Sequence, residues 1–281
     1  MLVGNKKNSV PYLFTIDKFP LLGHLMVDPN YLERKLKAHG TQLNMSVIDG
    51  IETLQAVTSF NRPVGCRELA RFLNLDTTRV NRLLRTLTFA GFIRKTSDRK
   101  YTIGPAMHVL AAQSLFASQV ISHAVKPLEA LRTYGMVVAM GVLWKDKVTY
   151  LYHALPELGS LEAVGRLGYF PATESGVGIS LLSNLDTEEV IHLYHDKDIP
   201  GFPAGVDALL KKLQETRDQG FARVRTTYQT HLPQGAITLA VNVGDPVHSA
   251  LALSGDIPDE RTSEFVAVLR EKALEIENHV D

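Results

Sequence analysis

The chain has 281 residues, enough for two domains, and its hydrophobic fraction of 45% is normal for a globular protein. A single cysteine excludes an internal disulfide framework and suits a reducing compartment, so we expect a cytoplasmic protein. No apolar run approaches the ~18 residues of a membrane span, and the first segment lacks a secretory pattern, so we expect no membrane contact.

The formal net charge of zero conceals an uneven distribution of charge along the chain. Residues 45–104 carry 10 Lys and Arg against 5 Asp and Glu, a net charge of +5. Residues 105–281 carry 14 against 22, a net charge of −8. A basic segment joined to an acidic one predicts that the first segment attracts phosphate groups.

Residues 1–43 form an extension ahead of the basic segment. A short helix is expected from Asp28 to Lys37, after the apolar stretch PYLFTIDKFPLLGHLM. Two interpretations stay open: a loosely ordered tail, or a segment that packs against a partner subunit or binds another protein.

Two helices are expected next, over Ser46–Ser59 and Cys66–Leu73. In the first, Ser46 and Asp49 have the spacing of a capping box. The apolar residues expected on its buried face are Val47, Ile51, Leu54 and Val57. The second leads through a tight turn of about three residues into a further helix, which fits a helix-turn-helix.

That further helix is predicted by the stretch DTTRVNRLLRTL, which begins at Asp76 and ends at Leu87. Asp76 has the position of an N-cap, whose carboxylate accepts from backbone N–H groups of the first turn. The spacing of three and four residues predicts an apolar stripe of Val80, Leu83, Leu84 and Leu87.

The opposite face of this helix carries side chains that suit a DNA major groove. Arg pairs bidentately with guanine, Asn pairs with adenine, and Thr meets a thymine methyl group or a phosphate. The residues expected to contact bases are Thr77, Thr78, Arg79, Asn81 and Arg82. The alternative is an ordinary surface helix with a solvated charged face.

Gly91 follows the Asp76 helix at a position where a left-handed C-cap is common. A short β-hairpin is expected after it, with strands over 92–95 and 100–103 and a polar turn between them. With the helices it predicts a winged helix-turn-helix over residues 44–104, whose wing touches phosphates or the minor groove. The residues expected to contact phosphates are Arg67, Arg85, Lys95, Arg99 and Lys100. A winged helix that contacts protein rather than DNA is the alternative.

The span Ser46–Gly104 resembles the N-terminal domain of the IclR family of bacterial transcriptional regulators. The resemblance rests on RELARFLNLDTTRVNRLLRTLTFAGFIRK, and on YTIG at the position where the family's wing ends in a Tyr-x-Leu-Gly-like sequence. It implies a regulator that binds a double-stranded DNA operator. Two half-sites read by two copies of the helix would require a homodimer or a dimer of dimers.

Residues 105–122 predict a linker helix, which serves either as a dimer contact or as a plain core helix. Residues 123–281 mix helices and strands without regular βαβ repetition, which predicts an α+β domain on a largely antiparallel sheet. The main expected elements are helices over 123–133, 176–185, 187–194, 206–219 and 261–280, and strands over 136–144, 148–153, 221–228, 236–243 and 249–254.

The stretch PATESGVGISLLS, Pro171–Ser183, resembles the turn and helix of the IclR effector-binding domain, a GAF-like or profilin-like α+β fold. The family's small-molecule effector lies between the sheet and the loop before this helix. Carried over, the resemblance implies effector contacts from Thr173, Glu174, Ser175, Gly176, Val177, Gly178, Ala240, Ala252 and Ser254.

Two residues depart from the family's pattern at this implied site. Glu174 stands where a small residue is usual, and Asn242 stands where the family often has Pro. A carboxylate in the pocket would repel an acidic ligand, although helix-start N–H groups attract one. Carboxylates and hydroxylated compounds both stay open as effectors, as does a Glu174 that is merely a solvated loop residue.

Other motifs in the acidic segment do not make a catalytic or metal site. His192 and His195 have metal-like spacing but no evident third ligand. Gly176-x-Gly178 lacks the third glycine of a dinucleotide fingerprint. We therefore expect no catalytic residue, metal or cofactor, and a ligand-responsive transcription regulator rather than an enzyme. The operator, the effector and the sign of regulation stay open.

Overall fold

The computed structural model describes residues 44–277, except for 158, 160–162, 164–168 and 227–234. The extension predicted over residues 1–43 lies outside the described residues. The described chain divides between Met107 and His108 into two compact units. None of the described helices is long and apolar enough to cross a membrane.

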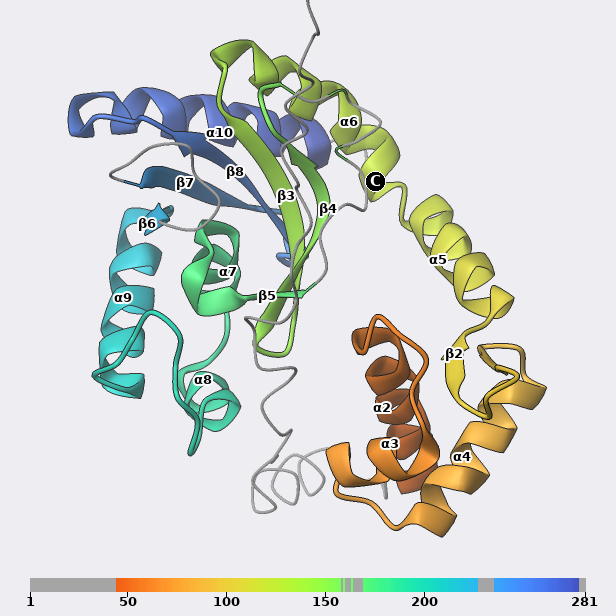
Figure 1. Cartoon of the computed structure of the whole chain (residues 1–281). Coiled ribbons are helices and arrows are strands. Elements are labelled where there is room, and N and C mark those ends of the chain that lie inside the picture. Colours follow the sequence, from red (N-terminus) through yellow and green to blue (C-terminus); the bar gives the residue numbers. More distant parts are fainter. Residues whose placement is uncertain (1–43, 158, 160–162, 164–168, 227–234, 278–281) are drawn as a thin grey trace, which may run out of the picture. The chain divides into compact units, whose positions relative to one another are not determined.

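The first unit is a winged helix-turn-helix, as the sequence predicts (Figure 1). Its elements are helices α2 (Met45–Ser59), α3 (Cys66–Phe72) and α4 (Thr77–Phe89), and strands β1 (Ile93–Lys95) and β2 (Tyr101–Ile103). The two strands pair antiparallel to form the wing, and Val64 adds a bridge to Tyr101.

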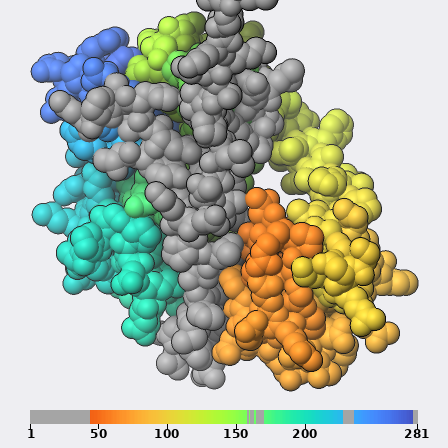
Figure 2. All heavy atoms as spheres, in the orientation of Figure 1, coloured from red at the N-terminus to blue at the C-terminus, as the bar shows by residue number. Residues whose placement is uncertain are grey.

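One small core holds this unit together. Figure 2 shows the surface atoms that surround it, coloured orange to yellow. The core takes residues from every helix and from both strands of the wing. Its buried members are Ala56, Val57, Val64, Leu69, Ala70, Val80, Leu84, Ile93 and Tyr101.

The start and the buried face of α2 differ from the prediction. Asn44, rather than Ser46, is the N-cap, because its side chain accepts from the Ser46 backbone N–H at 3.1 Å. Val47 and Ile51, expected inside, are 55% and 49% exposed. Val57 is buried as predicted, and Leu54 packs partly buried against the core. The other buried residues of the helix are Asp49, Thr53 and Ala56.

The end of α4 follows the prediction at Gly91, which has a φ of 78°. The Phe92 N–H donates to the Leu87 carbonyl at 3.0 Å, and the Gly91 N–H donates to the Thr88 carbonyl at 3.1 Å. These two bonds are those of a Schellman motif, which satisfies the last carbonyls of a helix. The turn directs the chain into β1.

The two helices predicted over 105–122 and 123–133 are both present, but the boundary between them lies earlier, at Gln119. Helix α5 (Pro105–Ser118) ends before Gln119, whose backbone is left-handed with a φ of 50°, and α6 (Val120–Leu131) follows at once. No residue of α5 is buried, and Phe116 is 86% exposed. Helix α5 is therefore not a core helix in the single chain, and its apolar side chains are exposed.

The second unit is built on a sheet of six described strands, all antiparallel, in the order β5-β4-β3-β8-β7-β6. This confirms the predicted α+β class. The strands are β3 (Val137–Trp144), β4 (Lys147–Ala154), β5 (Tyr169–Pro171), β6 (Ala222–Thr226), β7 (Ala236–Val243) and β8 (Ser249–Gly255).

Helices cover both faces of this sheet (Figure 1). One face packs against α6 and α10 (Thr262–Glu277). The other packs against α7 (Gly176–Leu182), with α8 (Thr187–Leu193) and α9 (Val206–Gln219) beyond it. The prediction matches α9 and β7 residue for residue, whereas α7 ends three residues before the predicted end at 185.

A β-bulge in β4 sends two tyrosines to opposite faces of the sheet. Tyr152 pairs with Met140 and Tyr150 pairs with Gly141, so Leu151 is the extra residue. Tyr150 therefore packs with the α7 core, and Tyr152 packs with the α6 and α10 core. Without the bulge, residues 150 and 152 would share one face.

Two glycines of the first unit give a matched test of its packing. A Cβ at Gly104 would lie 2.3 Å from the Gly91 carbonyl oxygen, whereas a Cβ at Gly50 would meet Leu83 at 4.0 Å. We expect Gly104→Ala to destabilise the unit by about 1–3 kcal/mol through overpacking. Gly50→Ala, inside α2, is expected to stabilise it by up to about 1 kcal/mol. Hydrogen exchange of peptides from residues 45–104 measures both, and equal effects of one sign would contradict the packing.

Candidate functional site

The first turn of α4 is capped as the sequence predicts. Asp76 Oδ1 accepts from the Thr78 N–H at 2.7 Å and from the Arg79 N–H at 3.1 Å. These backbone hydrogen bonds, that of Arg79 first, lower the pKa of the Asp76 carboxyl below its ordinary value. The cap fixes the start of the helix without covering its polar face.

The two faces of α4 have opposite character. Val80 and Leu84 are fully buried in the unit's core. Most of the predicted DNA contacts on this helix are exposed, namely Thr77, Thr78, Asn81, Arg82 and Arg85. The helix therefore presents hydroxyl, amide and guanidinium groups together.

Arg79 differs from its neighbours on α4. Its guanidinium forms an ion pair with Asp49 on α2, and its side chain is 41% exposed. Asp49 itself is almost fully buried, at 5% exposed. The structure thus gives Arg79 a partner inside the unit, which the pattern of α4 alone does not reveal.

The residues predicted to contact phosphates, Arg67, Lys95, Arg99 and Lys100, are all exposed in the structure. At the tip of the wing, Lys100 Nζ lies 3.0 Å from Asp98 Oδ2. Hydrogen bonds from Thr96 and Lys100 lower the pKa of Asp98. One acid thus partly offsets the positive charge of the wing.

In the second unit, the predicted effector residues gather where the segment η4 (Ala172–Glu174) leads into α7. Ser175 caps α7, because its Oγ accepts from the Gly178 N–H at 3.1 Å. The same Oγ lies 2.7 Å from the Tyr150 hydroxyl, which the bulge in β4 directs to this face. The bulge gives no sequence signal, so Tyr150 was missed.

Glycines let α7 lie very close to its neighbours. A Cβ at Gly176 would be 2.5 Å from Thr238 Cγ2, and a Cβ at Gly178 would be 2.1 Å from the Ala172 carbonyl oxygen. Val177, Ala240 and Ala252 are buried in the same core. The space around these small residues, which the resemblance implies as effector contacts, is occupied by neighbouring protein atoms.

A row of hydroxyl groups crosses three strands beside α7. Thr226 Oγ1 lies 2.9 Å from Thr238 Oγ1, which donates to Ser254 Oγ at 2.8 Å. Nearby on β7, Asn242 accepts from Ser180 Oγ at 2.9 Å. Only Ser254 of this row was predicted, because its members are adjacent across strands and distant in sequence.

Thr173 and Glu174 lie beside the connection between α8 and α9. A Cβ at Gly201 in that connection would meet the Thr173 carbonyl oxygen and Glu174 Cγ at 3.5 and 3.6 Å. Thr173 is 3% exposed, and its Oγ1 has no hydrogen-bond partner among the residues that the structure describes. Glu174 is half-buried.

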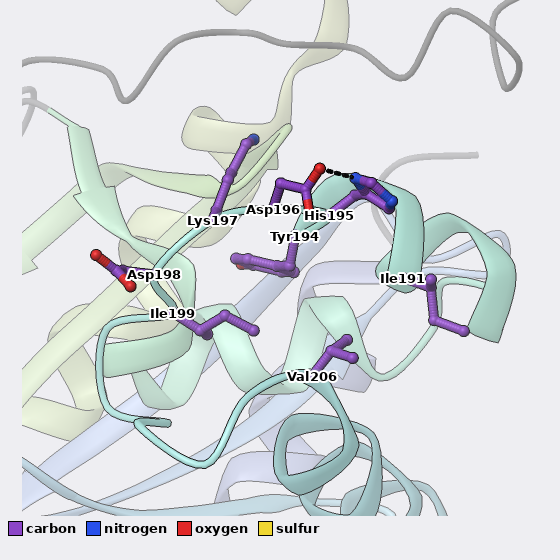
Figure 3. A pocket seen from close by; sticks show the side chains of 8 residues that line it. All are labelled: Ile191, Tyr194, His195, Asp196, Lys197, Asp198, Ile199 and Val206. Atoms are coloured by element: carbon purple, nitrogen blue, oxygen red, sulfur yellow. Dashed lines mark ion pairs between the residues drawn. The ribbon is translucent and has the colours of Figure 1, made fainter.

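A hollow of about 420 Å³ lies at the end of α8, and Figure 3 shows the side chains around it. Tyr194 and Lys197 line it, and burial raises the pKa of Tyr194 and lowers that of Lys197. None of the nine predicted effector residues lines this hollow.

His195 borders the hollow and pairs with Asp196, Nδ1 to Oδ2, at 3.0 Å. Within the described ranges, no group of three or more His, Cys, Asp and Glu side chains is placed to hold a metal ion. His192 and His195 are not joined there by a third such ligand.

The structure defines a class of protein: a winged helix-turn-helix unit followed along the chain by an antiparallel α+β unit. The chain is also 25% identical over 250 residues to the transcriptional repressor IclR of Escherichia coli, covering 82% of this chain and 88% of that protein. The predicted resemblance to the IclR family is thereby confirmed. No family model matches the chain.

Solved structures agree on the fold. An IclR family transcriptional regulator from Brucella abortus matches with a TM-score of 0.67 and 20% identity, covering 84% of this chain and 92% of that one. An IclR homolog from Microbacterium hydrocarbonoxydans, complexed with 4-hydroxybenzoate, matches with a TM-score of 0.58 and 19% identity, covering 83% and 98%. The comparison supports the two-part architecture, while the GAF-like label stays a prediction.

The lowered pKa of Asp76 predicts a pH-dependent cap. Its stabilising effect is present above the unfolded pKa of about 3.9 and is lost as the pH falls through the lower folded value. We expect Asp76→Ala to lower the urea midpoint at pH 7, whereas Asp76→Asn keeps it because Asn caps equally well. Below about pH 4 the unaltered chain should lose stability relative to Asp76→Asn. Parallel pH profiles for the two proteins would contradict this role.

Proposed function

We propose that this protein is a sequence-specific DNA-binding transcription regulator whose operator binding is modulated by a small-molecule metabolite. The observation that carries the proposal is the capped helix α4, which buries Val80 and Leu84 and leaves Thr78, Asn81 and Arg82 exposed. These are side chains that recognise base edges in a major groove. A regulator of this kind acts in the cytoplasm, where bacterial DNA lies.

The charge of the first unit supports this proposal. Arg67, Arg85, Lys95 and Arg99 are exposed on α3, α4 and the wing, and they are suited to phosphate contacts. Contacts of this type release counterions, so binding falls steeply as salt rises. A winged helix that contacts protein instead would show no such dependence on duplex DNA.

Helix α5 supports a proposed homodimer, or a dimer of dimers. It contains no Lys, Arg, Asp or Glu, none of its residues is buried, and four of its large apolar side chains are exposed. The four are Val109, Leu110, Leu115 and Phe116. Apolar surface of this extent is typical of an interface, and a dimer would place two α4 helices on two half-sites.

The proposed effector site lies at the start of α7 and on the facing strands. It offers the Thr173 hydroxyl, which has no hydrogen-bond partner in the described part of the chain, and the hydroxyl row that ends at Ser254. The Microbacterium hydrocarbonoxydans relative is complexed with 4-hydroxybenzoate, which carries both a carboxylate and a hydroxyl group. Ligand binding would change the affinity for DNA by favouring one of two arrangements of the protein.

Selection of bound duplexes from a random DNA pool, across a salt series, tests the proposal. Recovery of a motif with two half-sites, with affinity that falls steeply with salt, would support a dimeric regulator. A complete lack of enrichment at low salt, with and without candidate ligands, would overturn it in favour of a winged helix that contacts protein.

Arg82 and Arg85 provide a matched pair for testing base reading. Both are exposed on α4, but we expect Arg82 to meet a base and Arg85 to meet a phosphate. Arg82→Ala should cost about 1–3 kcal/mol on the selected duplex and relax specificity at one position. Arg85→Ala should weaken binding to all duplexes alike and reduce the salt slope by about 0.9. A uniform loss for both would make Arg82 a phosphate contact.

Glu174→Gln tests the chemistry of the effector. Because a carboxylate repels an acidic ligand, we expect the variant to bind aromatic and aliphatic carboxylates more tightly than the unaltered chain. The affinity for neutral hydroxylated compounds should not change. Thermal shifts with a panel that includes 4-hydroxybenzoate measure this, with Glu188→Gln on α8 as a control of equal charge change. If the compounds rank in the same order of thermal shift for the unaltered chain, Glu174→Gln and Glu188→Gln, Glu174 lies outside the ligand site.

A further inference from the structure

A buried carboxylate lies directly behind the first turn of α4. Asp49 on α2 is 5% exposed, and the structure pairs it with Nη2 of Arg79. Its Oδ2 atom is sealed from solvent and makes no hydrogen bond to the residues that the structure describes beyond this ion pair. A buried carboxylate is costly unless a cation compensates it, so the pairing is strongly favoured.

Both the backbone and the side chain of Arg79 are held by acidic residues. Its backbone N–H donates to the Asp76 cap at 3.1 Å, and its guanidinium reaches back to Asp49. Arg82 and Arg85 on the same helix are exposed, and neither forms an ion pair with a residue that the structure describes. The pairing therefore neutralises one of the three guanidinium groups of α4 and fixes its position against α2.

We propose that Asp49 is a positioning residue that sharpens DNA specificity by holding Arg79 away from the DNA. The inference rests on the proposed DNA-binding function and narrows the predicted set of base contacts to Thr77, Thr78, Asn81 and Arg82. A released Arg79 at the start of α4 would reach phosphates of any sequence, which adds affinity without discrimination. Asp49 removes that contribution.

Two variants test this directly in the full-length chain. Asp49→Asn keeps the size of the buried side chain and releases the guanidinium of Arg79. The double variant Asp49→Asn with Arg79→Gln removes both charges, so the net charge equals that of the unaltered protein. Each is measured on the selected duplex and on a scrambled duplex across a salt series, after urea unfolding has shown that it folds.

For Asp49→Asn we expect a steeper salt dependence, by about 0.9 in the log–log slope per protomer, because one more phosphate contact forms. Affinity for the scrambled duplex should rise, and the ratio of selected to scrambled affinity should fall. The double variant should return the slope to that of the unaltered chain. A purely structural role for Asp49 would change stability without changing the slope.

The outcomes separate this inference from the proposed function. If the unaltered chain binds no duplex, both fail. If it binds, and the double variant has a slope shallower by about 0.9 per protomer, Arg79 contacts DNA in the unaltered protein and the inference is overturned. An unchanged slope in Asp49→Asn overturns it as well. If Asp49→Asn does not fold, Asp49→Ala takes its place as the variant that releases Arg79, and the double variant still shows whether Arg79 contacts DNA in the unaltered protein.

Discussion

The start of α4 is the point on which the first unit depends. The first backbone N–H groups of a helix need hydrogen-bond acceptors from outside the helix. If the helix presents a polar face to a partner, these acceptors have to lie elsewhere than on that face. Asp76 supplies them from the helix end, and α4 has no acidic residue of its own in the first turn. Asp49 on α2 provides a second carboxylate, which forms an ion pair with the guanidinium of Arg79. The polar face is thereby left free of acids.

A different constraint, close approach, governs the second unit. Helix α7 lies so near the sheet and η4 that Gly176 and Gly178 have no space for a Cβ. The seven residues of α7 are all buried, so its polar groups need internal partners. Ser175 caps it, Ser180 bonds Asn242, and the bulge in β4 brings Tyr150 to Ser175. Asn242, which stands where the family often has Pro, thus has a structural reason, because its side chain accepts a hydrogen bond from Ser180.

Local signals in the sequence predicted most of the fold. The Asp76 cap, the Gly91 C-cap and the period of β7 each act within a few residues, so pattern alone finds them. Three features depend on distant residues and could not be read: the Asp49–Arg79 pair, the bulge at Leu151 and the hydroxyl row. The break between α5 and α6 was predicted after residue 122 instead of at Gln119, because Gln119 is left-handed without being a glycine. Each miss is a tertiary or backbone effect that propensity does not encode.

The packing of α7 bears on how a ligand at the predicted residues would act. Because Gly176 rests on Thr238 and Gly178 rests on Ala172, a molecule entering there has to move η4 or the start of α7 away from the sheet. A ligand changes an equilibrium only through a difference in affinity between two states. If the proposed effector site lies here, close packing in one state would provide that difference, since a ligand would bind the opened arrangement alone. On that proposal the small residues close the site in the unliganded protein, and the free energy of opening couples ligand binding to the arrangement of the protein.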